Sequence, residues 1–201
     1  MRMVDADPEL VEARLWAGEI TCLDCGGGLR PWGHARPRTL RDHGEPVEIR
    51  PRRSICRKCS ERLGRYTTHV LLPTLALLRR ADVVSVIGEA LMATYQEGRS
   101  RREVAARAGV PLDTVRGWRR RFREGAEETR VRFTMLAHEW DPEQGGVQAR
   151  ASPELDALEA IGVAAAAAVR RFGPEPLWQL VAGASGGRLL CNTSSPLPVL
   201  A

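Results

Sequence analysis

Four cysteines arranged as two CxxC pairs constrain the fold of this chain more than any other feature. The pairs are Cys22 with Cys25, and Cys56 with Cys59. Each pair can form a tight turn that offers two thiolates to one metal ion, and Gly26 suits the left-handed backbone of such a turn. Four sulfur ligands match tetrahedral zinc. We therefore expect Zn²⁺ as a cofactor in a zinc ribbon over residues 20–70, built from short β-hairpins.

Two alternatives remain open for these cysteines. They could be redox-active, although the strand–helix–strand pattern that accompanies a redox CxxC is missing. They could also be two metal-free pairs of buried thiols. His34, His43 and His69 are further possible ligands, but four cysteines already fill the coordination shell, so we expect these histidines at the surface or hydrogen-bonded in the core. Cys191 stands alone and is expected to be an ordinary thiol.

The charge of the expected ribbon favours polyanionic partners. The whole chain carries +5 at pH 7 and has a pI of about 9.3. Between residues 30 and 65, eleven basic side chains stand against four acidic ones, a difference of +7. Four thiolates with one Zn²⁺ lower this to +5. Such a surface can contact phosphates without reading sequence, and a solvated basic face is the alternative.

A second motif lies between Ser100 and Trp118. Ser100 and Glu103 have the spacing of a capping box that begins a helix. Ala105 is small where two helices must approach, and Gly109 lies where the turn needs a positive φ. Pro111 replaces the usual Ser or Thr cap of the second helix, and proline is acceptable at the start of a helix. The spacing predicts a helix-turn-helix.

The second helix of this motif is the candidate for reading DNA bases. If Val115 and Trp118 face inward, Arg116 and Arg120 face outward, where the N-terminal part of such a helix meets the major groove. We expect Arg116 and Arg120 to contact guanine, and Asp113 to be able to accept from cytosine. The alternative is a helical bundle with an arginine-rich solvent face.

Other residues of the motif are expected to hold the DNA backbone or to line the same outward face. The phosphate candidates are three further arginines of the second helix, Arg119, Arg121 and Arg123, and three at the entry to the first helix, Arg99, Arg101 and Arg102. The full expected DNA-binding set is Arg99, Arg101, Arg102, Leu112, Asp113, Thr114, Arg116, Gly117, Arg119, Arg120, Arg121 and Arg123.

These patterns predict a mainly α fold with a small β zinc ribbon. We expect an N-terminal zinc ribbon, a central helix-turn-helix bundle and a C-terminal helix. The expected division is an N-terminal helix over 1–19, the zinc ribbon over 20–70, the helix-turn-helix domain over 71–140, a linker over 141–152, a C-terminal helical segment over 153–182 and a flexible tail over 183–201.

Details of the helical part follow from its apolar spacing. Residues 75–78 could form a separate helical turn, and a stripe from Val115 to Trp140 predicts one long second helix of the motif. The end of that stripe and the alanine-rich face at 160–169 could cover each other or a second copy of the chain. We expect packing within the monomer, and a homodimer stays open.

The chain shows no secretory signal, and its most apolar stretch is about half the ~20 residues that a membrane span needs. We expect a cytoplasmic, nucleoid-associated protein with no membrane partner. No Ser/His/Asp set, glycine-rich phosphate loop or paired-carboxylate pattern stands out, so we expect no enzyme activity.

The order of these motifs resembles a known kind of protein. The resemblance rests on the sequence CxxCGG, a basic hairpin, R-x-R-x-x-C-x-x-C, a Leu-Pro step and the helix-turn-helix. It looks like the N-terminal DNA-binding part of insertion-sequence transposases and, more closely, like zinc-ribbon/helix-turn-helix proteins that accompany mobile elements in high-GC bacteria. The residues that carry it are Cys22, Cys25, Gly26, Gly27, Arg53, Cys56, Cys59, Leu72, Pro73, Arg79, Arg80 and Arg101 to Trp118.

The resemblance covers about residues 20–125, and Trp178 and residues 185–190 also fit such proteins. It implies binding to double-stranded DNA, at element ends for instance, with a transposase or recombinase encoded nearby as a partner. Residues 141–201 are too few for the catalytic domain of a transposase. Three functions remain open: a transposition accessory or regulatory factor, a transcriptional regulator without a transposon link, or an RNA- or protein-binding zinc-ribbon adaptor.

Overall fold

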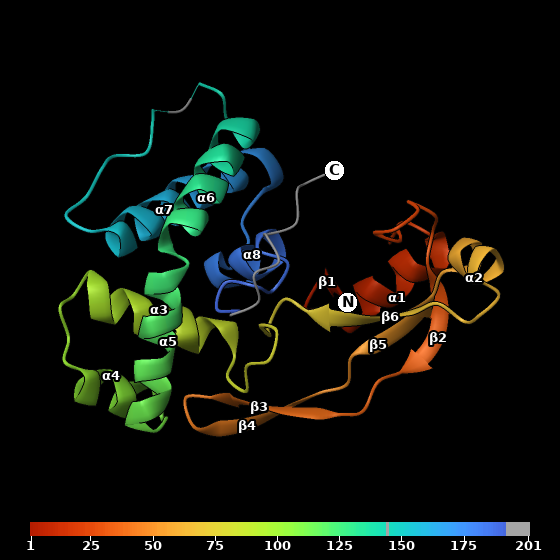
Figure 1. The fold of residues 1–201 in the computed structure, drawn as a ribbon, viewed down its shortest axis with the longest axis horizontal. Helices are drawn as coiled ribbons and strands as arrows, with labels where there is room; N and C mark the ends of the chain where they lie inside the picture. Colours follow the sequence, from red (N-terminus) through yellow and green to blue (C-terminus); the bar gives the residue numbers. More distant parts are fainter. Residues whose placement is uncertain (144, 192–201) are drawn as a thin grey trace.

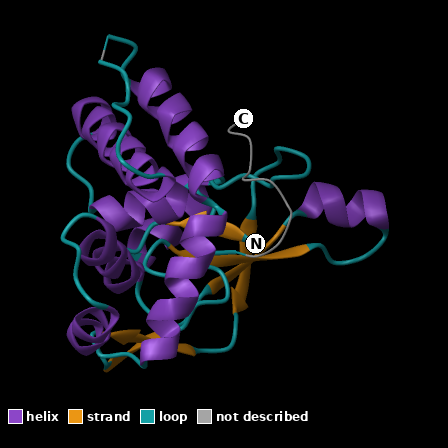
Figure 2. Cartoon of the chain, turned by 60° about the vertical axis from the view of Figure 1, so that its left-hand side comes forward, coloured by secondary structure: helices purple, strands orange, loops and turns teal. Residues whose placement is uncertain are grey.

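A computed structural model describes residues 1–143 and 145–191 (Figure 1). Its strands are β1 (Arg2–Val4), β2 (Arg30–His34), β3 (Arg38–Asp42), β4 (Glu45–Ile49), β5 (Arg52–Ile55) and β6 (Thr68–Pro73). Its helices are α1 (Pro8–Ala17), α2 (Arg57–Leu63), α3 (Val84–Tyr95), α4 (Arg101–Ala108), α5 (Leu112–Glu124), α6 (Ala126–Trp140), α7 (Pro153–Phe172) and α8 (Leu177–Ala184). The expected mainly α fold with a small N-terminal β part is confirmed. In Figure 2 most helices gather on one side of the molecule.

The N-terminal part is a four-stranded sheet with the order β1-β6-β5-β2. Helix α1 begins after the cap Asp7 and ends at Gly18, within the range of residues 1–19 predicted for the N-terminal helix. Its Val11 and Leu15 pack with Leu71 of β6 in a small hydrophobic cluster. Strand β1 was not predicted, because its three residues find their partner almost 70 positions later, in parallel with β6.

Strand β6 connects the two parts of the molecule. Its first residues pair with β5 of the ribbon, whereas Leu72 is buried in the large hydrophobic core of the helical part. The predicted boundary between residues 70 and 71 therefore falls inside one strand. We use "ribbon" for residues 20–70 and "helical domain" for residues 71–191.

The β3–β4 hairpin leaves the sheet and reaches the helix-turn-helix (Figure 1). Leu40 and Ile49 of this hairpin are buried in the large core. Arg41 donates through Nε and Nη2 to the two carboxylate oxygens of Asp82, at 2.8 and 3.1 Å. Because Asp82 is almost fully buried, this bidentate pair fixes the hairpin against the segment that precedes α3.

The helical domain is built on α3, which α4, α5, α7 and α8 contact. Trp178 of α8 lies directly over Gly88 of α3, where a Cβ would come within 1.9 Å of the indole. Any larger residue at position 88 would displace α8. Trp178, one of the residues that the resemblance singled out, thus has a packing role.

The predicted long helix from 112 to 140 is wrong. The helix breaks at Gly125, whose φ of −103° leaves the helical range, and α6 then follows in a new direction (Figure 1). Periodicity alone did not show the break because Phe122, Ala126 and Phe133 are buried on both sides of it. The predicted helical turn over 75–78 is also absent: Ala76 forms an isolated β-bridge with Val83.

Helices α6 and α7 pack side by side in the same direction, and the predicted linker returns from the end of α6 to the start of α7 (Figure 1). Phe133 and Leu136 of α6 are buried together with Ala160 and Ala164 of α7. The expectation that these two faces pack within the monomer is confirmed. Among the described residues, no helix is both long and apolar enough to cross a membrane.

Residues 183–191 differ from the flexible tail that we expected. Leu189 and Leu190 are buried in the large core. The carbonyl of Gly187 accepts from the N–H of Leu78, and that of Leu190 accepts from Nη2 of Arg80. These long-range contacts are invisible in a local composition of Gly and Ser. The rest of the expected tail, residues 192–201, lies outside the described residues.

Candidate metal centre and nucleic-acid interface

The four cysteines of the two CxxC pairs meet at one point of the ribbon. Their sulfur atoms all lie within 4.8 Å of one another. The closest sulfurs come from opposite pairs: Cys22 Sγ lies 3.8 Å from Cys59 Sγ, and Cys25 Sγ lies 3.4 Å from Cys56 Sγ. Three of the cysteines are buried and all are reduced. The sequence prediction that these four residues form one cluster is confirmed, and the cluster could hold a metal ion.

Local backbone structure aims each pair at the cluster. In the first pair, the N–H of Gly26 donates to Cys22 O, and Gly26 takes a φ of +67°. In the second pair, Cys56 caps α2, and its sulfur accepts from the N–H of Cys59. Both are compact turns that present two sulfurs to the same side, as expected for metal-binding CxxC turns.

The electrostatics of the cluster favour a cation. The N–H of Gly27 and the neighbouring thiols lower the pKa of Cys25 to about 7. The Cys25 thiolate and burial raise the pKa of Cys59 to about 12. One thiol thus ionises readily, while its negative charge makes ionisation of its neighbours harder. A bound cation would relieve this repulsion and allow all four sulfurs to ionise.

His69 is the histidine nearest to the cysteine cluster. Its Nε2 lies 3.5 Å from Cys22 Sγ, and Asp24 belongs to the same group of potential ligands. Burial lowers the pKa of His69, so the ring tends to be neutral. His69 is therefore a neighbour that can donate to a ligand sulfur rather than a surface residue.

Helices α4 and α5 form the predicted helix-turn-helix. Ser100 accepts from the N–H of Glu103, and the Glu103 carboxylate accepts from the N–H of Ser100, which is the predicted capping box. Gly109 ends α4 with a φ of +64°. Val115 and Trp118 are buried, as the motif requires. Pro111 precedes α5 without any side-chain cap.

The turn of the motif also receives the tip of the β3–β4 hairpin. His43 Nδ1 lies 3.0 Å from Arg107 O, and its Nε2 lies 3.5 Å from a carboxylate oxygen of Glu89. A Cβ on Gly109 would lie 2.5 Å from the backbone carbonyl of His43. Gly109 is therefore needed for its positive φ and for this close contact. This contact could not be predicted from the sequence, because no local pattern links residues 43 and 109.

The outward face of α5 carries the two arginines predicted to read bases. The side chain of Arg116 is 70% exposed and that of Arg120 is 63% exposed. Arg116 lies 3.6 Å from Asp113, and Arg120 lies 3.9 Å from Glu124. Such exposed pairs within one helix are weak, so phosphate or base contacts can replace them.

Five of the predicted arginines line one shallow hollow of about 340 Å³. It lies between the start of α4 and the outward face of α5. The lining residues are Arg101, Arg116, Arg119, Arg120 and Arg123. Because all five lining side chains are arginines, the hollow is basic and suits phosphate oxygens.

Other predicted residues have structural partners. Arg123 donates to Glu154 of α7 at 2.8 Å, and the Arg119 guanidinium lies 5.9 Å from the centre of the Tyr95 ring. Arg99 is paired with Glu97. The Nη1 atom of Arg121 lies 2.8 Å from where a Cβ on Gly117 would be, so this arginine reaches back over the preceding turn of α5. The remaining members, Arg102, Leu112 and Thr114, lie at the surface or partly exposed.

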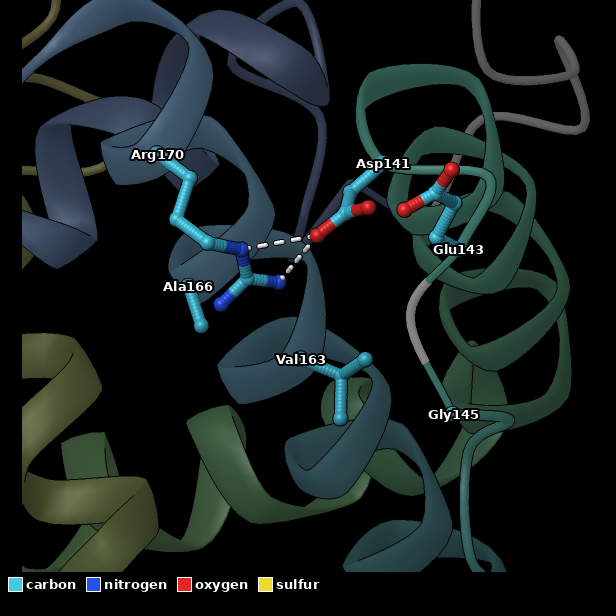
Figure 3. A pocket seen from close by; sticks show the side chains of 6 residues that line it. All are labelled: Asp141, Glu143, Gly145, Val163, Ala166 and Arg170. Carbon is cyan, nitrogen blue, oxygen red and sulfur yellow. Dashed lines mark hydrogen bonds and ion pairs between the residues drawn. The ribbon is translucent and has the colours of Figure 1, made fainter.

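A second hollow lies where the C-terminal ends of α6 and α7 meet (Figure 3). Arg170 and Asp141 form an ion pair of 2.7 Å at its rim, and Glu143 and Gly145 of the linker line its other side. Its charged groups come from the loop after α6 and from the end of α7, and the ion pair joins α7 to the residue after α6. We interpret this hollow as part of the contact between these two helix ends.

Comparison with known proteins supports the motif assignment. A family model described as a helix-turn-helix domain matches residues 89–129, which run from α3 into α6. No curated protein and no solved structure matches the chain. The match identifies α4 and α5 as a helix-turn-helix and indicates DNA binding. The ribbon lies outside the matched residues.

Proposed function

We propose that this protein is a zinc-stabilised, sequence-specific DNA-binding protein that acts as an accessory or regulatory factor of a mobile element, in the cytoplasm and on its DNA. The observation that carries the proposal is the convergence of exposed arginines on the outward face of a helix-turn-helix. The proposed role is binding without cleavage, alongside a transposase or recombinase encoded nearby.

Zinc is the proposed metal because the donor set and its spacing suit it. With Zn–S bonds of about 2.3 Å, tetrahedral coordination places the sulfurs about 3.8 Å apart. The distances between opposite pairs are 3.8 and 3.4 Å, so small shifts complete the geometry. Cys22, Cys25, Cys56 and Cys59 would hold the ion, which supplies folding free energy to the ribbon and no reaction step.

Base reading is assigned to the exposed face of α5. A helix in the major groove presents its exposed face to base edges, and arginine makes two hydrogen bonds to guanine O6 and N7. Arg116 and Arg120 lie one turn apart on the exposed face. Arg101, in the first turn of α4, lies across the hollow and is placed to hold a phosphate.

Binding to duplex DNA selected from a random pool tests the assignment. Arg116→Ala or Arg120→Ala is expected to weaken binding to the selected duplex by about 1–3 kcal/mol and to relax specificity. Arg150→Ala is the matched control, since Arg150 pairs with Glu159 of α7 and lies outside α4 and α5. If both α5 variants retain the preference of the wild type for the selected duplex, the reading helix is assigned wrongly.

The alternative is transcriptional regulation without a link to transposition, and the same interface would serve both roles. A third possibility is an RNA- or protein-binding adaptor. Salt-dependent binding to duplex DNA separates the first two functions from the third, because phosphate contacts release counterions.

A further inference from the structure

An exposed aromatic pair lies on the ribbon, outside the helix-turn-helix. Trp32 of β2 and Tyr66, two residues before β6, have ring centroids 5.2 Å apart at an interplanar angle of 38°. Trp32 is 44% exposed and Tyr66 is 77% exposed. Strand β5 lies between β2 and β6 in the sheet. The two rings therefore meet across β5 and leave much of their surface to solvent.

The backbone of β2 directs Trp32 outward. The β2–β5 register shifts between Pro31 and Gly33, so Trp32 has no partner on β5. Such a bulge changes the direction in which a side chain points. Gly33 takes a φ of +109°, and no other atom lies within 4 Å of where its Cβ would be. The glycine is therefore needed for the backbone conformation of the bulge and not for a close contact. The fold thus holds a large indole at an edge strand without burying it.

Arginines flank the two rings. Arg53 of β5 lies opposite Gly33, the residue after Trp32. The Nη2 atom of Arg53 donates to Thr68 Oγ1 at 2.9 Å, and Thr68 is two residues after Tyr66. Arg65 directly precedes Tyr66 and is exposed. Among the residues that the structure describes, neither Arg53 nor Arg65 has an acidic partner in an ion pair. Helix α1 covers the opposite side of β5, where Arg52 binds Glu12.

This combination matches the chemistry of single-stranded nucleic acid. Exposed rings stack on unpaired bases, and arginines beside them hold the phosphates between the bases. An apolar protein partner would gain from the rings but would desolvate the arginines without compensation. The basic excess of the ribbon, eleven basic against four acidic side chains over residues 30–65, supports the anionic partner.

We propose that Trp32 and Tyr66 form a stacking platform for unpaired bases of single-stranded DNA, with Arg53 and Arg65 on the adjacent phosphates. The platform is a second DNA-binding surface. It is separate from the helix-turn-helix and does not depend on duplex reading by α5.

Fluorescence anisotropy with two single-stranded probes tests the platform on the full chain loaded with zinc. One probe is oligo(dT) of about twelve nucleotides, within the usual site size of such surfaces. The other is an abasic oligomer with the same number of phosphates, which reports electrostatic attraction alone. Wild type is expected to bind oligo(dT) more tightly. Tyr66→Leu is expected to weaken oligo(dT) binding about tenfold and to leave abasic binding unchanged.

Matched variants separate stacking from folding. Tyr66→Phe keeps the ring and is expected to bind as wild type does. Trp16→Leu removes another exposed indole, on α1, and is expected to have no effect. Unchanged metal content and unchanged duplex binding of Tyr66→Leu show that the ribbon is still folded.

Three results would overturn the proposal. They are equal wild-type affinity for the two probes, oligo(dT) binding by Tyr66→Leu as tight as wild type, and tighter binding to oligo(U) RNA than to oligo(dT). The double variant Arg116→Ala/Arg120→Ala keeps this test apart from the proposed function. It is expected to lose duplex specificity and to keep the preference for oligo(dT) over the abasic oligomer.

Discussion

The ribbon and the helical domain reach stability by different means. The hydrophobic cluster of the ribbon contains three buried cysteines. Only two other buried members, Ile20 and Leu29, belong to residues 20–70. The remaining buried members come from α1 and β6. The helical domain buries a continuous core from α3 to α8, with Phe122, Phe133 and Trp178 among its large side chains. We therefore expect the ribbon to depend on a bound metal, whereas the helical domain can fold by packing.

The contrast has a limit at the β3–β4 hairpin. The hairpin belongs to the ribbon in sequence, but Leu40 and Ile49 are buried in the large core and its tip touches the turn of the helix-turn-helix. The hairpin therefore connects the ribbon, which holds the cysteine cluster, to the helix-turn-helix.

Loss of the metal is expected to have the largest effect, and only in the ribbon. Structural zinc supplies about 10–16 kcal/mol of apparent binding free energy. Chelation, or Cys56→Ser, should therefore remove amide-exchange protection from α2 and from the β2, β5 and β6 strands, while α6 and α7 stay protected. Hydrogen exchange measures the protection of the two parts, and metal analysis measures the bound zinc. Cys191→Ser, at a thiol outside the cluster, is the control and should leave both unchanged. A chelated protein with a protected ribbon would refute the metal account.

A cavity in the helical core is expected to have the next largest effect. Phe133 of α6 is fully buried, so Phe133→Ala should lower the free energy of unfolding by about 3–5 kcal/mol. Metal stoichiometry should stay the same, because the ribbon's own cluster is untouched. Met135→Ala on the same helix is the control, as Met135 is 68% exposed. Metal loss in Phe133→Ala would mean that the two parts do not fold independently.

The hairpin contact is tested by Gly109→Ala. A positive φ disfavours alanine, and the new Cβ would strike the backbone carbonyl of His43. We expect these two effects together to lower the free energy of unfolding by about 2–3 kcal/mol. Gly98→Ala is the control, because Gly98 has a φ of +67° but nothing within 4 Å. Denaturant unfolding of the two variants should differ. Equal losses would show that the hairpin tip adds nothing to the stability of the turn.

The smallest effect is expected at the Arg123–Glu154 pair, which joins α5 to α7. Burial would raise the pKa of Glu154, but hydrogen bonds from Arg123, the helix N–H and Ser152 outweigh it and lower the pKa below 4.5. The lowered pKa stabilises the fold above pH 4.5, and this contribution is lost as the pH falls through the folded pKa.

Glu154→Gln should therefore lower the free energy of unfolding by about 1 kcal/mol at pH 7 and by less at pH 3. Denaturant unfolding at both pH values measures the difference. Glu127→Gln is the control for a surface pair, since its side chain is 67% exposed beside Arg130, and it should change the stability less. A loss for Glu154→Gln that does not depend on pH would contradict the ionised pair.

Local signals made much of this molecule predictable. The caps Asp7 and Ser100, the C-terminal Gly109 and the two CxxC pairs act within a few residues, and all appear where the sequence places them. What could not be predicted depends on distant partners. Strand β1 forms only because β6 offers an edge, and residues 183–191 are held by the segment around Leu78.

The candidate site shows the same division. Exposure of Arg116 and Arg120 follows from helical periodicity, and the structure agrees with it. The partners of Arg119 and Arg123 come from α3 and α7, so their structural contacts needed the tertiary fold. The ring pair across β5 needed both the strand order and the bulge in β2.

Selection of bound duplexes from a random DNA pool is the sharpest test of base reading by α5. The experiment compares wild type, the chelated protein and the double variant Arg116→Ala/Arg120→Ala. We predict that wild type enriches one motif containing guanines, that chelation lowers the recovery of this motif without changing it, and that the double variant enriches none. Enrichment of the same motif by the double variant, or of no motif by wild type, would contradict the assignment of base reading to α5.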